Sequence, residues 1–161
     1  MKRIAALLLL VLAGTFVAPA ASDEPLVGYW QMIFQEIGGA KTKPLPIAIR
    51  ITQDGSRLIF SYLMNREQEL TMTFTAHLDG SPVPVSDGRG AAKGAARLSK
   101  VSPTEYRLVL QMPNRPPEPG KLVLTDKGFI LRIESDGIMP DVGRRHIVQV
   151  FSKLQSNLTG D

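Results

Sequence analysis

Short runs of alternating apolar and polar residues recur along this 161-residue chain, and turn-forming residues separate them. The clearest run spans 46–53, where Ile47, Ile49 and Ile51 share one face of an extended segment. From 69 to 78, apolar side chains again occupy one face and threonines the other. A period of two predicts β-strands that are buried on one side, and no run shows a convincing helical period.

The turns between these runs indicate hairpins. Asp54-Gly55 and Asp126-Lys127-Gly128 suit tight hairpin connections, and Asp79-Gly80 is interpreted as a further turn. Closing a meander of strands into a barrel removes exposed sheet edges, so the fold class we expect is all-β, an antiparallel up-and-down β-barrel of about 8–10 strands. The strands expected from the pattern are 26–35, 46–53, 57–64, 69–78, 83–85, 97–101, 105–112, 121–125, 129–135 and 145–153.

Two longer loops interrupt the expected meander. One is the segment 86–96, which is rich in glycine and alanine, and the other is the proline-rich segment 113–120. Pro82 precedes the short run 83–85 and Pro84 lies within it, and neither has the amide hydrogen that a central strand donates. That run is therefore expected at an edge or rim.

The first residues have the pattern of a signal peptide. Lys2 and Arg3 precede the apolar stretch 4–17, and small residues at Ala18 and Ala20 suit cleavage after Ala20, with Ala21 as a near alternative. An apolar stretch of about 14 residues is short for a membrane anchor, which is the alternative interpretation. We expect residues 1–20 to be removed, and residues 21–161 to form one exported domain, periplasmic or secreted.

Composition excludes several classes of protein. The chain has no cysteine, which removes disulfides, thiol catalysis and most structural zinc sites. Without Lys2 and Arg3 the formal charge falls from +4 to +2, and the remaining basic residues are scattered. This charge pattern predicts neither a nucleic-acid partner nor strong attachment to an anionic membrane. After cleavage of the signal peptide, we expect no integral membrane segment in the mature chain.

Gly28-Tyr29-Trp30, near the start of the mature part, resembles the Gly-x-Trp motif of the lipocalin family. The resemblance implies a structural role for Gly28 and Trp30: the tryptophan plugs the closed end of a barrel, and the glycine gives it room. Lipocalins also cover this tryptophan with a basic residue late in the chain, for which Arg144 and Arg145 are candidates. The alternative is that Trp30 is an ordinary core residue.

Further short matches, taken in order, make the mature chain similar to small secreted bacterial proteins of lipocalin-like type, which are mostly uncharacterised. The resemblance implies a lipocalin-like barrel and does not imply an enzyme. The matching segments are Phe74-Thr75-Ala76, Asp79-Gly80, Pro84-Val85, Leu98-Ser99-Lys100, Tyr106 and Lys127-Gly128.

The residues that carry catalysis or bind metals are sparse. His77 and His146 are far apart, and neither has the spacing of a metal-binding pair. Glu134, Asp136 and Asp141 lie near one loop but lack the regular oxygen ligands of a calcium loop. We therefore predict no catalytic residue, no metal, no cofactor and no enzymatic activity.

The apolar faces of the central strands suggest a cavity wall, with an ordinary filled core as the alternative. The function predicted is a non-catalytic periplasmic or secreted binding protein for a small apolar or amphipathic, lipid-like molecule. The alternative is a protein-interaction module of the cell envelope, an assembly factor or enzyme inhibitor, that uses the loops 86–96 and 113–120. The candidate ligand-binding residues are Phe60, Tyr62, Met72, Phe74, Leu108 and Leu110.

Overall fold

A computed structural model of the protein describes residues 24–65, 67–139 and 143–154, so the expected signal peptide lies outside the described part. No helix among the described residues is long and apolar enough to cross a membrane. A short 3₁₀ turn, η1 (Asp126–Gly128), accompanies the strands. These are β1 (Gly28–Ile37), β2 (Ala40–Thr42), β3 (Ile47–Asp54), β4 (Arg57–Met64), β5 (Glu69–Ala76), β6 (Asp79–Asp87), β7 (Ala92–Ser102), β8 (Glu105–Gln111), β9 (Glu118–Thr125), β10 (Ile130–Met139) and β11 (Gly143–Leu154).

The strands form an antiparallel meander that closes on itself. From β3 to β11 each strand pairs with the next, and β11 pairs with β1 along most of its length. The beginning of β1 pairs with β3 and its end with β2, so the small β2 continues the edge that β3 occupies. The result is a closed barrel of ten strands, which confirms the predicted fold class.

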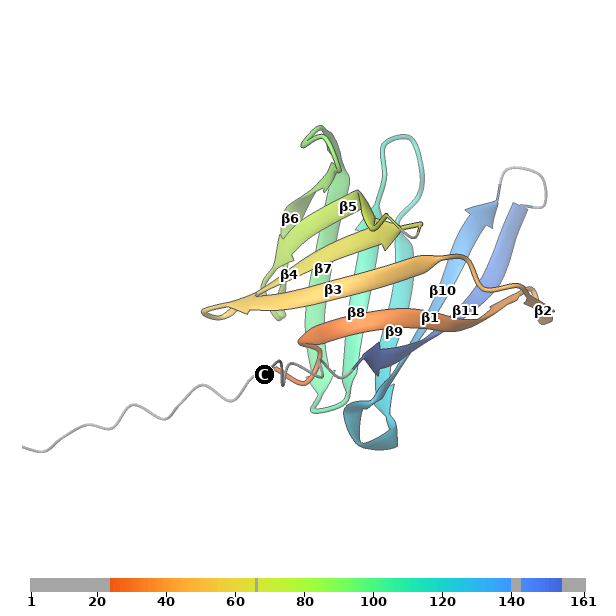
Figure 1. Ribbon diagram of the computed structural model, residues 1–161. Helices are drawn as coiled ribbons and strands as arrows, with labels where there is room; N and C mark the ends of the chain where they lie inside the picture. The colour runs from red at the N-terminus through yellow and green to blue at the C-terminus, as the bar shows by residue number, and fades with distance from the viewer. Residues whose placement is uncertain (1–23, 66, 140–142, 155–161) are drawn as a thin grey trace, which may run out of the picture.

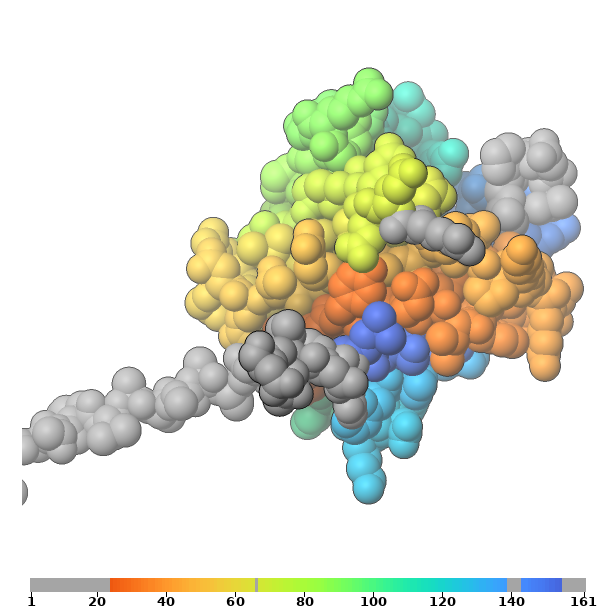
Figure 2. All heavy atoms as spheres, viewed as in Figure 1, coloured from red at the N-terminus to blue at the C-terminus, as the bar shows by residue number. Residues whose placement is uncertain are grey.

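The barrel is strongly sheared. In Figure 1, β1, β3 and β4 cross in front of β7, β8 and β9, so the two walls face each other across the core. Figure 2, viewed from the same side, shows the end of β11 packed directly beside β1. A β-bulge at Ile33 shifts the register of β1 against β11, and it leaves this isoleucine 50% exposed on the outside.

One apolar cluster fills the inner face of the barrel. Its buried members come from nearly every strand, and the largest are Trp30, Tyr106, Phe60 and Phe151. This is the core that the alternating runs predicted, because residues at alternate positions of a strand point to the same face. Further inward-facing side chains are only half-buried: Val27, Ile47, Tyr62, Met72, Leu78, Val83 and Leu110.

The loop predicted for 86–96 is wrong in extent, since β6 continues to Asp87 and β7 begins at Ala92. Glycine and alanine serve close packing here rather than flexibility. A Cβ on Gly94 would lie 2.1 Å from the carbonyl oxygen of Gln111 on β8, so only glycine fits. The predicted turn at Asp79-Gly80 is likewise part of β6.

The loop predicted for 113–120 is also shorter than expected, because β9 begins at Glu118. Pro119 stands in this strand opposite Val109. Proline and glycine at 119 and 120 hide the alternation of the sequence, although the strand itself continues through them. This extension places Glu118 in the wall of the barrel.

Candidate functional site

Trp30 is completely buried beside the residues that precede β1, and its indole Nε1 donates a hydrogen bond to the carbonyl oxygen of Leu26 at 2.8 Å. The ammonium of Lys153 lies 5.1 Å from the centre of the ring and donates to the carbonyl oxygen of Pro25 at 3.2 Å. Partial burial lowers the pKa of Lys153. A Cβ on Gly28 would lie 2.4 Å from Cε of this lysine, so the glycine makes room for it.

The residue that covers Trp30 is therefore Lys153 rather than Arg144 or Arg145. The antiparallel register pairs Trp30 with Lys153, near the end of β11, whereas both arginines lie near its beginning. The sequence alone did not identify Lys153, because the basic residue that meets Trp30 is set by the register of β1 against β11.

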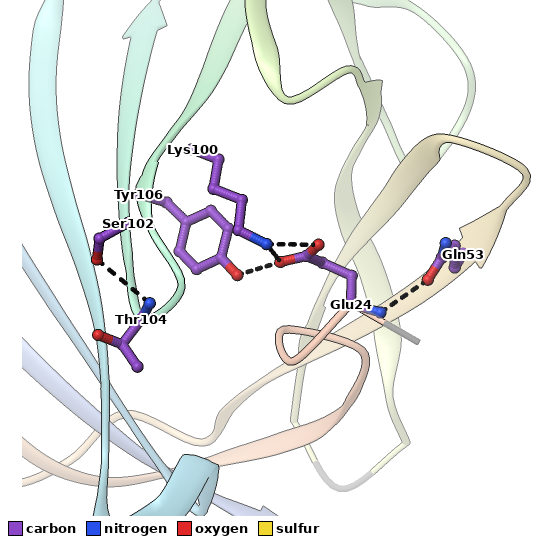
Figure 3. Close-up of polar contacts among 6 residues, drawn as sticks. All are labelled: Glu24, Gln53, Lys100, Ser102, Thr104 and Tyr106. Carbon is purple, nitrogen blue, oxygen red and sulfur yellow. Dashed lines mark hydrogen bonds and ion pairs between the residues drawn. The ribbon is translucent and has the colours of Figure 1, made fainter. Parts of the chain in front are cut away.

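A second polar cluster holds the residues just before β1 in place, and Figure 3 shows its geometry. The carboxylate of Glu24 accepts hydrogen bonds from the hydroxyl of Tyr106 and, at 2.9 and 3.0 Å, from the ammonium of Lys100. The amide of Glu24 donates to the side chain of Gln53 at 2.9 Å. Burial, reinforced by the Glu24 carboxylate, raises the pKa of Tyr106. We call residues 24–27 the plug segment, and we call the end of the barrel at which they lie the closed end. The contacts of Glu24 and the buried side chain of Leu26 fix the segment there.

The six predicted ligand-binding residues all belong to or pack against the inner cluster. Phe60 and Phe74 stack with their ring centres 4.8 Å apart, and the ring of Tyr62 lies 6.4 Å from that of Phe74. Burial raises the pKa of Tyr62. The structure buries Phe60, Phe74 and Leu108 and leaves Tyr62, Met72 and Leu110 half-buried.

Few ladder pairs join β5 to β6. Only two residue pairs join these strands, Met72 with Asp87 and Thr73 with Ser86. Pro82 and Pro84 on β6 have no amide hydrogen to donate to either neighbouring strand. A depression of about 290 Å³ opens at this place, and it reaches the inner-face residue Phe74; its other lining residues are Arg57, Thr73, Thr75, His77, Val83, Pro84 and Ser86.

Known proteins resemble this chain in fold and not in sequence. No protein-family model matches the sequence, and no curated protein matches it. Among solved structures, the ileal bile acid-binding protein of zebrafish, complexed with cholic acid, aligns with a TM-score of 0.55 and 13% sequence identity over 81% of this chain and 99% of that chain. The chain has a lipocalin-like fold. At this low identity the likeness concerns the fold alone.

The outer wall of the lipocalin-like barrel carries a second depression, of about 300 Å³, across β8 to β11. Its acids are engaged by basic neighbours: Glu105 pairs with Lys121 at 3.1 Å, and Asp136 pairs with His146 at 3.1 Å. Arg132 bonds to Glu134 and lowers its pKa. No group of three or more metal-ligating side chains occurs in the described part of the chain, and Asp141 lies outside it.

Polar side chains also occur on the inner face, towards the end opposite the plug segment. Gln35 is 5% exposed and pairs across the strands with Gln149. Glu118 lies on the face of β9 that carries the buried Leu122 and Leu124. Its Oε1 atom is shielded from solvent, and among the described residues it has no hydrogen-bond partner. Sequence reasoning missed Glu118, because it assigned the residue to a loop.

Proposed function

We propose that this protein is a non-catalytic binding protein that holds a small apolar or amphipathic molecule inside its barrel. The observation that carries the proposal is the incomplete burial of inward-facing side chains. Tyr62, Met72 and Leu110 pack against the core yet are half-buried, so each keeps apolar surface that a small molecule can contact. Apolar walls with few polar groups are typical of small-molecule sites.

Two further features support the proposal. The depression between β5 and β6 is lined in part by Phe74, one of the predicted ligand-binding residues. The zebrafish protein with the same fold was solved with cholic acid, an amphipathic molecule.

A blocking substitution tests the site directly. Replacing Met72 with tryptophan places a bulky indole ring where we propose that the ligand lies. We expect the substitution to weaken binding of a neutral fluorescent apolar dye by about tenfold or more, a loss of about 1.4 kcal/mol or more. The matched control is Thr71→Trp on the same strand, whose side chain is exposed. Its dye affinity should stay within about twofold of the wild type.

Stability measurements on the same variants separate a cavity from a filled core. In a barrel with free space Met72→Trp costs little stability, whereas overpacking a filled core costs about 1–3 kcal/mol. Dye titration and urea unfolding of both variants give the answer. A wild-type protein that shows no saturable dye binding, together with a strongly destabilised Met72→Trp variant, would contradict the carrier proposal and favour a protein-interaction module.

The proposed carrier works outside the cytoplasm, in the periplasm or as a secreted protein. We expect the mature protein to begin at Ala21 or Ser22, because Ala18 and Ala20 suit the narrow pockets of a signal peptidase. Either start leaves Glu24, the anchor of the plug segment, in the mature chain. The intact mass of protein isolated from a bacterial periplasm checks this expectation, and a product that retains residues 1–20 would contradict it.

A further inference from the structure

We propose that the molecule held in the barrel carries a protonated amine, which donates a hydrogen bond to the carboxylate of Glu118. The inference rests on the proposed carrier function and adds the polar chemistry of the ligand to it. It starts from the buried, unpartnered Oε1 atom of Glu118 and from the arrangement of the other charged groups on the inner face.

Glu118 lies on the inner face of β9, at the end of the strand opposite the plug segment. It pairs across the strands with Leu110, one of the half-buried apolar residues, and the inner face of β9 continues through Leu122 and Leu124 towards the closed end. The residue as a whole is half-buried. An amphipathic molecule whose apolar part lies against Leu110 therefore has its polar group beside this carboxylate.

In the described part of the chain, none of the basic groups on the inner face bonds to Glu118. Lys100 bonds to Glu24, and Lys153 bonds to the plug segment and covers Trp30, both at the closed end. At the end opposite the plug segment, Arg145 pairs with Gly137 in register, and its guanidinium donates to the carbonyl oxygen of Arg144 at 3.2 Å. None of the ion pairs found among the described residues includes Glu118. Lys121, on the same strand, bonds to Glu105 on the outer wall.

This distribution favours a donor over an acceptor in the ligand. A buried carboxylate oxygen without a partner is unfavourable, and an ammonium supplies both a charge-assisted hydrogen bond and the opposite charge. A ligand carboxylate at the same position would bring two like charges together in a partly desolvated site. Single-chain amphiphiles that differ only in the polar group should therefore bind in a fixed order.

Isothermal titration calorimetry with three matched probes tests the order at pH 7. The probes are dodecylammonium, 1-dodecanol and dodecanoate, each at monomeric concentrations. For the wild-type mature protein we expect dodecylammonium to bind about tenfold or more tightly than 1-dodecanol, because hydrogen bonds to charged groups are the stronger ones. Dodecanoate should bind more weakly than 1-dodecanol.

The variant Glu118→Gln keeps the shape of the side chain and removes its charge. We expect it to lose the preference for dodecylammonium and to bind dodecanoate more tightly than the wild type, while its affinity for 1-dodecanol stays within about threefold. The matched control is Glu105→Gln, which removes one negative charge from the outer wall of the adjacent strand. It should leave the order of the three probes unchanged.

The outcomes separate this inference from the carrier function. If the wild type binds all three probes with equal affinity, or if Glu118→Gln keeps the preference for dodecylammonium, the role of Glu118 is refuted and the carrier function stands. If no probe binds to a folded wild-type protein, the carrier function itself fails. Folding of each variant is verified by circular dichroism, and a Glu118→Asn variant gives a second test where Glu118→Gln does not fold.

Discussion

Replacing Trp30 with alanine is expected to lower the free energy of unfolding of the mature protein by about 3–5 kcal/mol, as truncation of a packed aromatic core residue does. Trp30 is completely buried, it bonds to the carbonyl oxygen of Leu26, and the ammonium of Lys153 lies over its ring. The substitution leaves a void at the closed end, removes the hydrogen-bond donor of the Leu26 carbonyl, and removes the ring beneath the Lys153 ammonium. Such a loss is a large part of the stability of a typical single domain.

Urea unfolding followed by far-ultraviolet circular dichroism measures this effect, since the chain has a single tryptophan and the variant has no useful fluorescence. Trp30→Phe retains most of the apolar volume and leaves the Leu26 carbonyl unpaired, so we expect an intermediate loss of about 1–3 kcal/mol. The matched control is Ile33→Ala, on the exposed bulge of the same strand, which should change stability by no more than about 0.5 kcal/mol. Equal losses in Trp30→Ala and Ile33→Ala would contradict the plugging role.

Alkaline solution is expected to destabilise the barrel through Tyr106. Burial and the Glu24 carboxylate raise the pKa of this tyrosine in the folded protein above the ordinary value of about 10. Above that pH the unfolded chain has lost the tyrosine proton while the folded protein keeps it, so the free energy of unfolding falls by about 1.4 kcal/mol per pH unit for this group. The contribution is complete below about pH 10 and is lost as the pH rises through the raised pKa.

Urea unfolding between pH 9 and 12, with Tyr106→Phe as the comparison, isolates this contribution. The phenylalanine variant should be less stable at neutral pH, because Glu24 loses a donor, and its stability should fall less steeply above about pH 10. Tyr62, whose pKa is also raised, contributes in the same direction in both proteins, and Lys153, whose pKa is lowered, contributes in the opposite direction in both. Parallel pH profiles for the two proteins would refute the role of Tyr106.

The alternation of the sequence predicted the strands whose inner and outer faces differ in polarity. β3 and β4 were recognised almost to the residue, because isoleucine alternates with polar side chains in β3 and Asp54-Gly55 marks the turn between them. β6, β7 and the start of β9 were underestimated. There, Pro84, Gly94 and Pro119 stand inside strands, where local propensity disfavours them and tertiary packing accepts them.

Only part of the candidate site could be predicted from the sequence. Periodicity placed Phe60, Phe74 and their neighbours on the inner face, because that inference needs only one strand at a time. The partnership of Trp30 with Lys153, and that of Glu24 with Tyr106 and Lys100, depends on which residues meet across distant strands. One sequence without such register information cannot supply these contacts.

Pairing of β1 with β11 has a consequence for how the protein is made. Lys153 and Pro25, which meet at the closed end, stand 128 positions apart in the chain, and β11 is the last strand of the meander. Because the chain is synthesised from its amino terminus, the edge of β1 that pairs with β11 stays unpaired until synthesis and any passage across a membrane are nearly complete. Native contacts between such distant residues slow folding, and unpaired edges promote association with other chains. The barrel is therefore most in need of a holding chaperone just before its final strand arrives, and a chain truncated before β11 is expected to aggregate rather than to form a smaller barrel.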